Sequence, residues 1–173
     1  VTVAELKGCG DAIGTLALGE WCSADAARLL DTKHKVPCRI LDMPFGLKAT
    51  DRFIDALRIV SGTVVPDEVS YERGQLVDLI SDMHQYFYHK KVALYGDPDQ
   101  LIAMTEFLGT LDMWPMHIVT GTPGKAFERR IREITKDLPY AVNVKAGGDM
   151  FLLHQWIKNE PVDLLIGNTY CMY

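Results

Sequence analysis

The strongest hydrophobic pattern in the chain is a short apolar run followed by a turn and a helical stretch. Lys91–Tyr95 is mostly apolar and stops at Gly96, which predicts a buried strand ending in a turn. Asp97 suits an N-cap, Pro98 suits the first helical position, and Gln100 stands where a capping box takes Glu or Gln. A helix is therefore predicted to begin directly after the strand.

Apolar periodicity continues this helix and leads to a second strand. The positions that recur every three or four residues are Leu101, Met104, Thr105, Leu108 and Leu111. A strand is then predicted at Met116–Thr120, beginning after Pro115. Strand, helix and strand in this order predict a βαβ unit with two parallel strands.

Similar patterns predict the remaining elements. Residues 12–18 form a short apolar run between glycines, and strands are expected at 38–41, 141–145 and 163–166. Helices are expected from a cap at Ser23 to Pro37, from Thr50 and Asp51 to Gly62, from Pro66 to about Tyr88, from Phe127 to Leu138 with Glu128 and Arg132 on the exposed side, and over 149–159. The predicted fold class is α/β, with Rossmann-like or flavodoxin-like parallel sheets and flanking helices.

Two consecutive helices interrupt the alternation and suggest a division of the chain. Residues 1–46 read as the end of one α/β domain, 47–89 as connecting helices, and 90–173 as a second, Rossmann-like domain that is truncated at its C-terminal end. The chain starts with Val1 rather than methionine and stops soon after a predicted strand. We therefore expect it to be a piece of a longer polypeptide.

Composition narrows the class of protein. With 48% hydrophobic residues and a net charge of −5, the chain can bury a core and gives no electrostatic reason to expect nucleic acid or an anionic membrane as partner. No window approaches the apolar length of a membrane span, and no signal peptide is seen. Cys9, Cys22, Cys38 and Cys171 form no C-x-x-C pair, which favours buried free thiols in a reducing cytoplasm.

Sequence motifs for phosphate or nucleotide binding are weak. No G-x-G-x-x-G follows the strand at Gly96, and Asp97 and Asp99 would repel a pyrophosphate. Gly121–Lys125 is shorter than a phosphate loop, and Ala126 stands where Ser or Thr would hold Mg²⁺. The five histidines are scattered without an H-E-x-x-H motif, so no zinc or catalytic triad site is predicted.

One constellation of candidate ligands stands out, on the long helix after Pro66. Asp78 and Asp82 are one turn apart with Gln75 and Gln85 on the same stripe, so both carboxylates point the same way and can hold a hard cation if another chain completes the shell. The alternative is a solvated polar face. Apolar residues on more than one side of this helix suggest burial between two bodies.

Four motifs in order along the chain resemble the β chain of nitrogenase component 1. They are Pro44–Asp51, Glu72–Asp78, Leu94–Asp99 and Asp163–Tyr170, and the resemblance covers essentially the whole chain. Two further stretches, Thr120–Lys125 and Met150–Lys158, look most similar to the iron-only type of the enzyme. One departure is Cys171-Met172, where relatives usually continue with Gly-Lys.

The resemblance implies a subunit of the enzyme that reduces N₂ to ammonia with electrons from an ATP-dependent iron protein. The full subunit is expected to share an eight-iron (8Fe-7S) cluster with the α chain through cysteines upstream of this piece, so no catalytic or cluster-binding residue is expected here. Expected partners are the α chain, a second β chain, a small δ subunit and, transiently, the iron protein. Asp78 and Asp82 would hold a Ca or Fe ion between two β chains.

Other classes of protein share the predicted fold. A nitrogenase-like scaffold for cofactor assembly or a subunit of the dark-operative tetrapyrrole reductase would differ in the upstream cysteines. A free-standing flavodoxin-like module would bind flavin or nucleotide. Titration of the chain with these ligands distinguishes the last alternative.

Overall fold

The computed structural model describes residues 2–172, apart from the side chains of Tyr170 and Met172. The chain forms two compact units, Val1–Arg73 and Gly74–Tyr173, which are described separately. Across the described residues, no helix combines the length and the hydropathy needed to cross a membrane.

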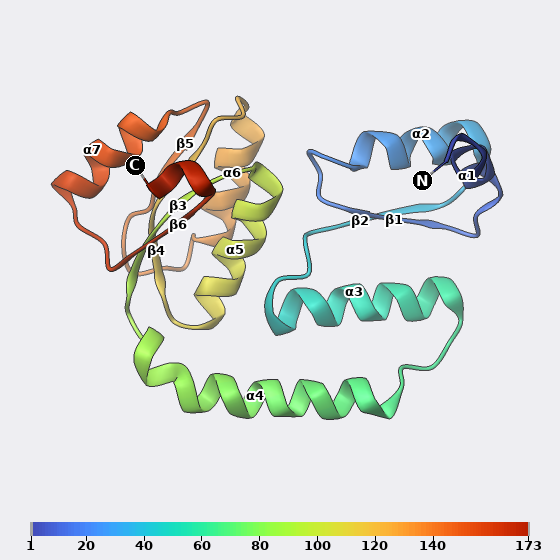
Figure 1. Cartoon of the computed structure of the whole chain (residues 1–173), viewed down its shortest axis with the longest axis horizontal. Helices are drawn as coiled ribbons and strands as arrows, with labels where there is room; N and C mark the ends of the chain where they lie inside the picture. The colour runs from blue at the N-terminus through green and yellow to red at the C-terminus, as the bar shows by residue number, and fades with distance from the viewer. Residues whose placement is uncertain (1, 173) are drawn as a thin grey trace. The chain divides into compact units, whose positions relative to one another are not determined.

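The first unit is built around a small parallel sheet. Its elements are α1 (Val3–Lys7), the 3₁₀ turn η1 (Gly8–Asp11), β1 (Thr15–Leu18), α2 (Ala24–His34), β2 (Cys38–Leu41), α3 (Gly46–Ser61) and the start of α4 (Asp67–Phe87). Strands β1 and β2 pair in parallel, with Thr15 opposite Cys38. The helix α2 connects them, so this is a βαβ unit (Figure 1).

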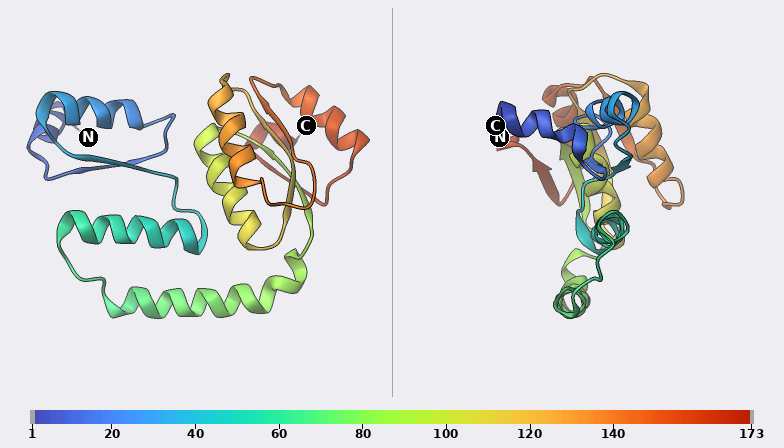
Figure 2. Two further views of the ribbon diagram at one scale, coloured as in Figure 1. Left: turned by 180° about the vertical axis from the view of Figure 1, so that it is seen from behind. Right: turned by 90° about the vertical axis from the view of Figure 1, so that its right-hand side faces the viewer.

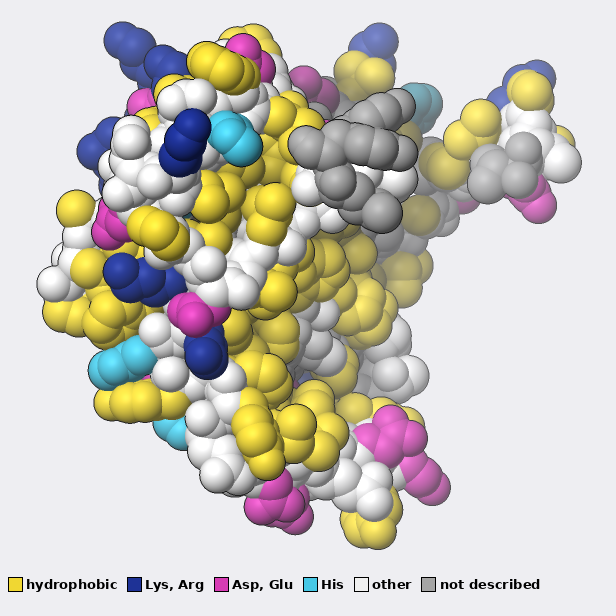
Figure 3. Space-filling view, turned by 60° about the vertical axis from the view of Figure 1, so that its left-hand side comes forward, with side chains coloured by type: hydrophobic (Ala, Val, Ile, Leu, Met, Phe, Trp, Pro, Cys, Tyr) yellow, Lys and Arg dark blue, Asp and Glu magenta, His cyan; other side chains and the backbone are white. Residues whose placement is uncertain are grey.

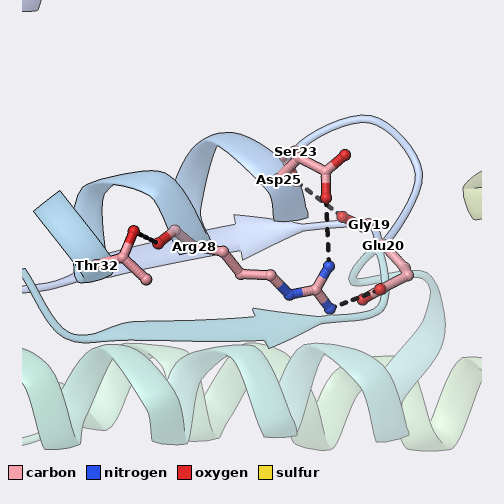
Figure 4. Close-up of polar contacts among 6 residues, drawn as sticks. All are labelled: Gly19, Glu20, Ser23, Asp25, Arg28 and Thr32. Atoms are coloured by element: carbon pink, nitrogen blue, oxygen red, sulfur yellow. Dashed lines mark hydrogen bonds and ion pairs between the residues drawn. The ribbon is translucent and has the colours of Figure 1, made fainter.

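Ser23 has a different role from the predicted helix cap. Its hydroxyl donates to the carbonyl oxygens of Leu18 and Gly19, each at 2.9 Å, and therefore ties the start of α2 to the end of β1. Figure 4 shows this turn beside Arg28, which pairs with Glu20 at 2.6 Å. The helix α2 ends before Pro37, at Lys35, which has a left-handed conformation. In this conformation the Lys35 and Val36 amides donate to carbonyls of the last turn of α2, which closes the helix.

The predicted start of α3 was wrong. The helix begins at Gly46, so Thr50 and Asp51 lie inside it rather than before it. Both polar side chains have partners that their positions in the sequence did not reveal. Thr50 donates to the Pro44 carbonyl at 3.0 Å, and Asp51 accepts two hydrogen bonds of 2.8 Å from Arg73. The predicted end is confirmed, because Gly62 closes the helix at φ 69°.

The second unit has four parallel strands with helices on both faces of the sheet, and its edge strand β6 is largely exposed. Its elements are most of α4, β3 (Lys91–Tyr95), α5 (Pro98–Thr110), β4 (Trp114–Thr120), α6 (Lys125–Ile134), β5 (Asn143–Ala146), α7 (Met150–Asn159), β6 (Leu164–Gly167) and the 3₁₀ turn η2 (Thr169–Met172). The strand order is β5-β4-β3-β6. Helices α5 and α6 cover one face and α7 the other (Figure 2), which confirms the predicted α/β class.

The core of this unit lies along β3 and β4. Val92, Ala93, Leu94, Ile118 and Val119 are fully buried, as expected for parallel strands with helices on both faces. Phe127 and Ile131 of α6 are buried against one face, and Leu153 of α7 contacts Ala93 and Val119 on the other. The apolar run at 91–95 was therefore a correct prediction of a central strand.

Three details of the second unit differ from the prediction. Strand β4 begins at Trp114 and includes Pro115, which sits where the register between β3 and β4 shifts at Val92/Ala93; a missing amide is tolerated at such an irregularity. Asp97 occupies the N-cap of α5 without a capping hydrogen bond from its side chain. Leu138 lies beyond α6, which ends at Ile134.

Glu128 also differs, because it does not lie on a free surface facing Arg132. Its carboxylate accepts a hydrogen bond of 3.0 Å from the Ala146 amide at the end of β5. The contact joins α6 to the sheet. The i to i+4 spacing of the charges in the sequence therefore did not reveal the partner that the tertiary structure provides.

Candidate metal site and the exposed α4 helix

Asp78 and Asp82 lie on α4, one turn apart and both exposed. The predicted helix therefore exists, and the two carboxylates project from the same face. Within the described part of the chain, no third His, Cys, Asp or Glu comes close enough to form a metal-binding group with them. The pair supplies at most part of the oxygen shell of a hard cation, which takes six to eight ligands in the case of Ca²⁺.

The surface around these carboxylates is unusually apolar for an exposed helix. None of the 21 residues of α4 is buried. The large apolar side chains exposed along it include Leu76, Leu79, Met83 and Tyr86, with Leu79 at 56% and Tyr86 at 61%. A helix that leaves such residues in water is typical of an interface whose partner is another chain.

A second apolar surface lies on α7 and β6. A cavity of about 650 Å³ is lined by apolar side chains of these elements together with His154, Gln155 and Cys171. Figure 3 shows hydrophobic side chains gathered over this side of the second unit. Phe151 is 70% exposed there, and Leu164 and Leu165 on the edge strand β6 are also exposed.

The comparisons with known proteins concern the whole chain. The profile of the family described as "Nitrogenase component 1 type Oxidoreductase" matches residues 1–173. The chain belongs to the nitrogenase component 1 family. It is 47% identical over 169 residues to the nitrogenase molybdenum-iron protein beta chain of Clostridium pasteurianum, covering 97% of this chain and 37% of that protein.

Two further relatives of this family extend the comparison. The nitrogenase vanadium-iron protein beta chain of Trichormus variabilis is 30% identical over 179 residues, covering 99% of this chain and 39% of that protein. A solved structure described as "Nitrogenase Cp1 at pH 6.5" has a TM-score of 0.93 at 47% identity, covering 96% of this chain and 37% of that one. The chain thus spans between a third and two fifths of the length of these relatives.

The loop Gly121–Lys125, compared above with a phosphate loop, is hydrogen-bonded to the loop after β5. The Gly147 and Gly148 amides donate to the carbonyls of Thr122 and Thr120, at 3.1 and 3.0 Å. The Thr122 amide donates to the Thr120 hydroxyl at 3.3 Å. These bonds join the loops after β4 and β5, and they use the Thr122 amide of Gly121–Lys125 within the fold.

The cysteines are all free, but the expectation that they are buried was wrong. Cys22 is exposed, and Cys9, Cys38 and Cys171 are half-buried. Cys22 lies in the turn before α2, where its thiol donates to the Leu18 carbonyl at 3.3 Å. Cys171 lines the cavity beside α7, and burial raises the pKa of its thiol.

Two histidines have specific partners that the sequence did not indicate. His84 Nε2 lies 2.9 Å from Asp112 Oδ2. His117 is fully buried in β4; its Nε2 donates to the Glu160 carbonyl at 2.9 Å, and its Nδ1 accepts from the Asn143 amide at 3.1 Å. Because a carbonyl only accepts, Nε2 carries a hydrogen in this arrangement. His117 therefore joins β4, β5 and the end of α7.

Proposed function

We propose that this chain is part of the β subunit of nitrogenase component 1, which reduces N₂ to ammonia with electrons from an ATP-dependent iron protein. The main support is that the family profile matches the whole chain and that 97% of the chain aligns, at 47% identity, with a molybdenum-iron protein beta chain. In this assignment, residues 1–46 are the C-terminal part of the middle α/β domain of the subunit. Residues 47–89 are helices that connect it to the third domain, and residues 90–173 form much of that third domain. The role of these residues is structural and inter-subunit.

The proposed partners follow from this assignment. They are the α chain, a second β chain, a small δ subunit and, transiently, the iron protein. The full subunit would share an eight-iron cluster with the α chain through cysteines upstream of this piece. The exposed apolar side chains of α4 support a protein partner on that helix, and four free thiols are consistent with a reducing cytoplasm.

The experiment is to purify the full-length protein from its native host through an affinity tag. Co-purification of an α chain and ammonia formation that depends on the iron protein and ATP would support the proposal. Recovery with an α-like chain but without N₂ reduction would overturn it and favour a cofactor-assembly scaffold. Recovery with neither would also overturn it.

The metal of the active cofactor stays a prediction. The stretches Thr120–Lys125 and Met150–Lys158 predict the iron-only type, whereas the relatives reported above are named for molybdenum and vanadium. Elemental analysis of the purified complex distinguishes these types. Molybdenum or vanadium at cofactor stoichiometry would contradict the iron-only prediction.

Asp78 and Asp82 are proposed to hold a Ca or Fe ion between two β chains. The support is their placement on one face of α4, where both are exposed, and the absence of buried residues along this helix. In the assembled complex, the double variant Asp78→Asn/Asp82→Asn should lose this ion, because amides do not supply the negative charge of two carboxylates. Calcium and iron are measured by elemental analysis after removal of loosely bound metal.

A matched control is available on the same helix. Glu68 and Glu72 are also exposed and one turn apart, so Glu68→Gln/Glu72→Gln removes the same charge at another place. This control should keep the ion. Equal metal content in the wild type and the Asp78→Asn/Asp82→Asn variant would show that the pair is a solvated face.

A further inference from the structure

Five aromatic rings of the second unit form a continuous row, which we call the aromatic row: His84, Tyr88, His89, Trp114 and Tyr140. The ring centroids of successive members are 5.4, 3.8, 4.4 and 4.8 Å apart. Tyr88 and His89 are stacked at an interplanar angle of 19°. These separations are those of rings in contact, so the row is an unbroken path of π-systems.

The backbone builds this row at the junction between α4 and β3. His89 has φ 58°, a left-handed conformation that is uncommon outside glycine and that turns its ring between Tyr88 and Trp114. Its amide donates to the Asp112 carbonyl at 2.9 Å, and the Trp114 amide donates to the Lys90 carbonyl at 2.8 Å. The positions of the middle rings are therefore set by main-chain hydrogen bonds.

Tyr88 and Tyr140, which lie on opposite sides of Trp114 in the row, differ in their access to a proton acceptor. The Tyr140 hydroxyl is buried and lacks a hydrogen-bond partner among the described residues, and burial raises the pKa of Tyr140 to about 12. Tyr88 is 51% exposed, so its phenol can release a proton to water. A tyrosine is oxidised by one electron most readily when its proton has an acceptor. The row therefore favours a radical at Tyr88 over one at Tyr140.

We propose that the aromatic row passes one-electron oxidising equivalents from Trp114 to Tyr88, where they leave the protein. A strong one-electron oxidant, such as the carbonate radical anion, takes an electron from the Trp114 indole and becomes carbonate. Tyr88 then gives an electron to the indole cation through the stacked His89 ring and its phenol proton to water. A thiol-class or ascorbate-class reductant returns one electron and one proton to the Tyr88 radical.

The test exposes the full-length protein to carbonate radical generated by light and maps oxidation at Trp114 by peptide mass spectrometry. Tyr88→Phe keeps the ring but removes the readily oxidised phenol. His89→Asn removes the bridging ring, and asparagine tolerates the left-handed backbone. Both variants should show a several-fold rise in kynurenine, an oxidation product of tryptophan, at Trp114. The reason is that Tyr88 no longer reduces the Trp114 indole cation.

The matched control is Tyr86→Phe, because Tyr86 is also exposed on α4 but has no place in the row. This variant should leave Trp114 oxidation at the wild-type level. Equal kynurenine at Trp114 in the wild type, Tyr88→Phe and His89→Asn would overturn the proposal. So would an equal rise in Tyr86→Phe, since that would indicate simple competition among surface tyrosines for the oxidant.

Discussion

Helices α4 and α5 are successive helices of the chain, separated by the strand β3, but have opposite environments. Helix α5 has 13 residues, of which seven are buried, while α4 has 21 and none is buried. Both carry apolar residues at helical spacing. The difference teaches that periodicity shows which side of a helix is apolar but not whether the covering surface belongs to the same chain. In α5 the sheet of the second unit supplies that surface.

The largest effect on the free energy of unfolding is expected from a substitution that creates a cavity beside the buried helix α5. Ile102 of α5 is 2% exposed, so Ile102→Ala should lower the free energy of unfolding by about 2–5 kcal/mol. Urea unfolding of the purified full-length protein measures the change. A loss below about 1 kcal/mol would contradict the assignment of α5 to a tightly packed core.

A buried polar bridge offers the next largest effect. His117→Leu leaves the Glu160 carbonyl and the Asn143 amide without the partners they have in the native structure. We expect a loss of about 1–3 kcal/mol from the free energy of unfolding, because part-buried polar groups left unpaired keep part of their desolvation cost. Adding Asn143→Leu should restore part of the loss. A double variant as destabilised as the sum of the singles would argue against the bridge.

The polar contact of α4 with α3 should have a smaller, pH-dependent effect. Arg73 hydrogen bonds lower the pKa of Asp51 below its usual 3.8. A carboxylate with a lowered folded-state pKa contributes stability above its unfolded pKa and loses it as the pH falls through the folded pKa. Asp51→Asn should therefore be slightly less stable than the wild type at neutral pH, with the difference disappearing in strong acid. Urea titrations at the two pH values measure it.

The smallest effect on unfolding is expected on the exposed side of α4. Leu79 is 56% exposed, so Leu79→Ala should change the free energy of unfolding of the dissociated subunit by less than about 0.5 kcal/mol. If α4 is an interface, the same variant should weaken association of the full-length protein. Analytical ultracentrifugation over a concentration series measures this, and unchanged association would place Leu79 outside the contact.

Prediction from sequence succeeded where one local signal was sufficient. The strand at 91–95, the strand at 38–41 and the helix end at Gly62 follow from apolar runs between breakers and from glycine's left-handed conformation. It failed where a polar side chain had a distant partner. Asp51 and Glu128 looked like a cap and a surface charge, but their partners Arg73 and Ala146 are 22 and 18 residues away in other elements.

The candidate site was predictable to the same extent. Placing Asp78 and Asp82 on one helix face needed only the 3.6-residue period, and the helix is present. The other ligands of a cation could not be predicted, because they would come from outside the described chain. The aromatic row was not predictable either, since its five rings come from residues 84 to 140 and its two parts are joined by His89, which has a positive φ.

The sequence by itself determined the α/β class, the order of most elements and, through four ordered motifs, the resemblance to nitrogenase component 1. These depend on local propensity and periodicity, which are properties of neighbouring residues. Only the tertiary structure decided that α4 stays uncovered while α5 is buried, and that His117 and the aromatic row find their partners. The physical reason is that burial and hydrogen bonding join residues far apart in the chain, whose proximity exists only after the strands have paired.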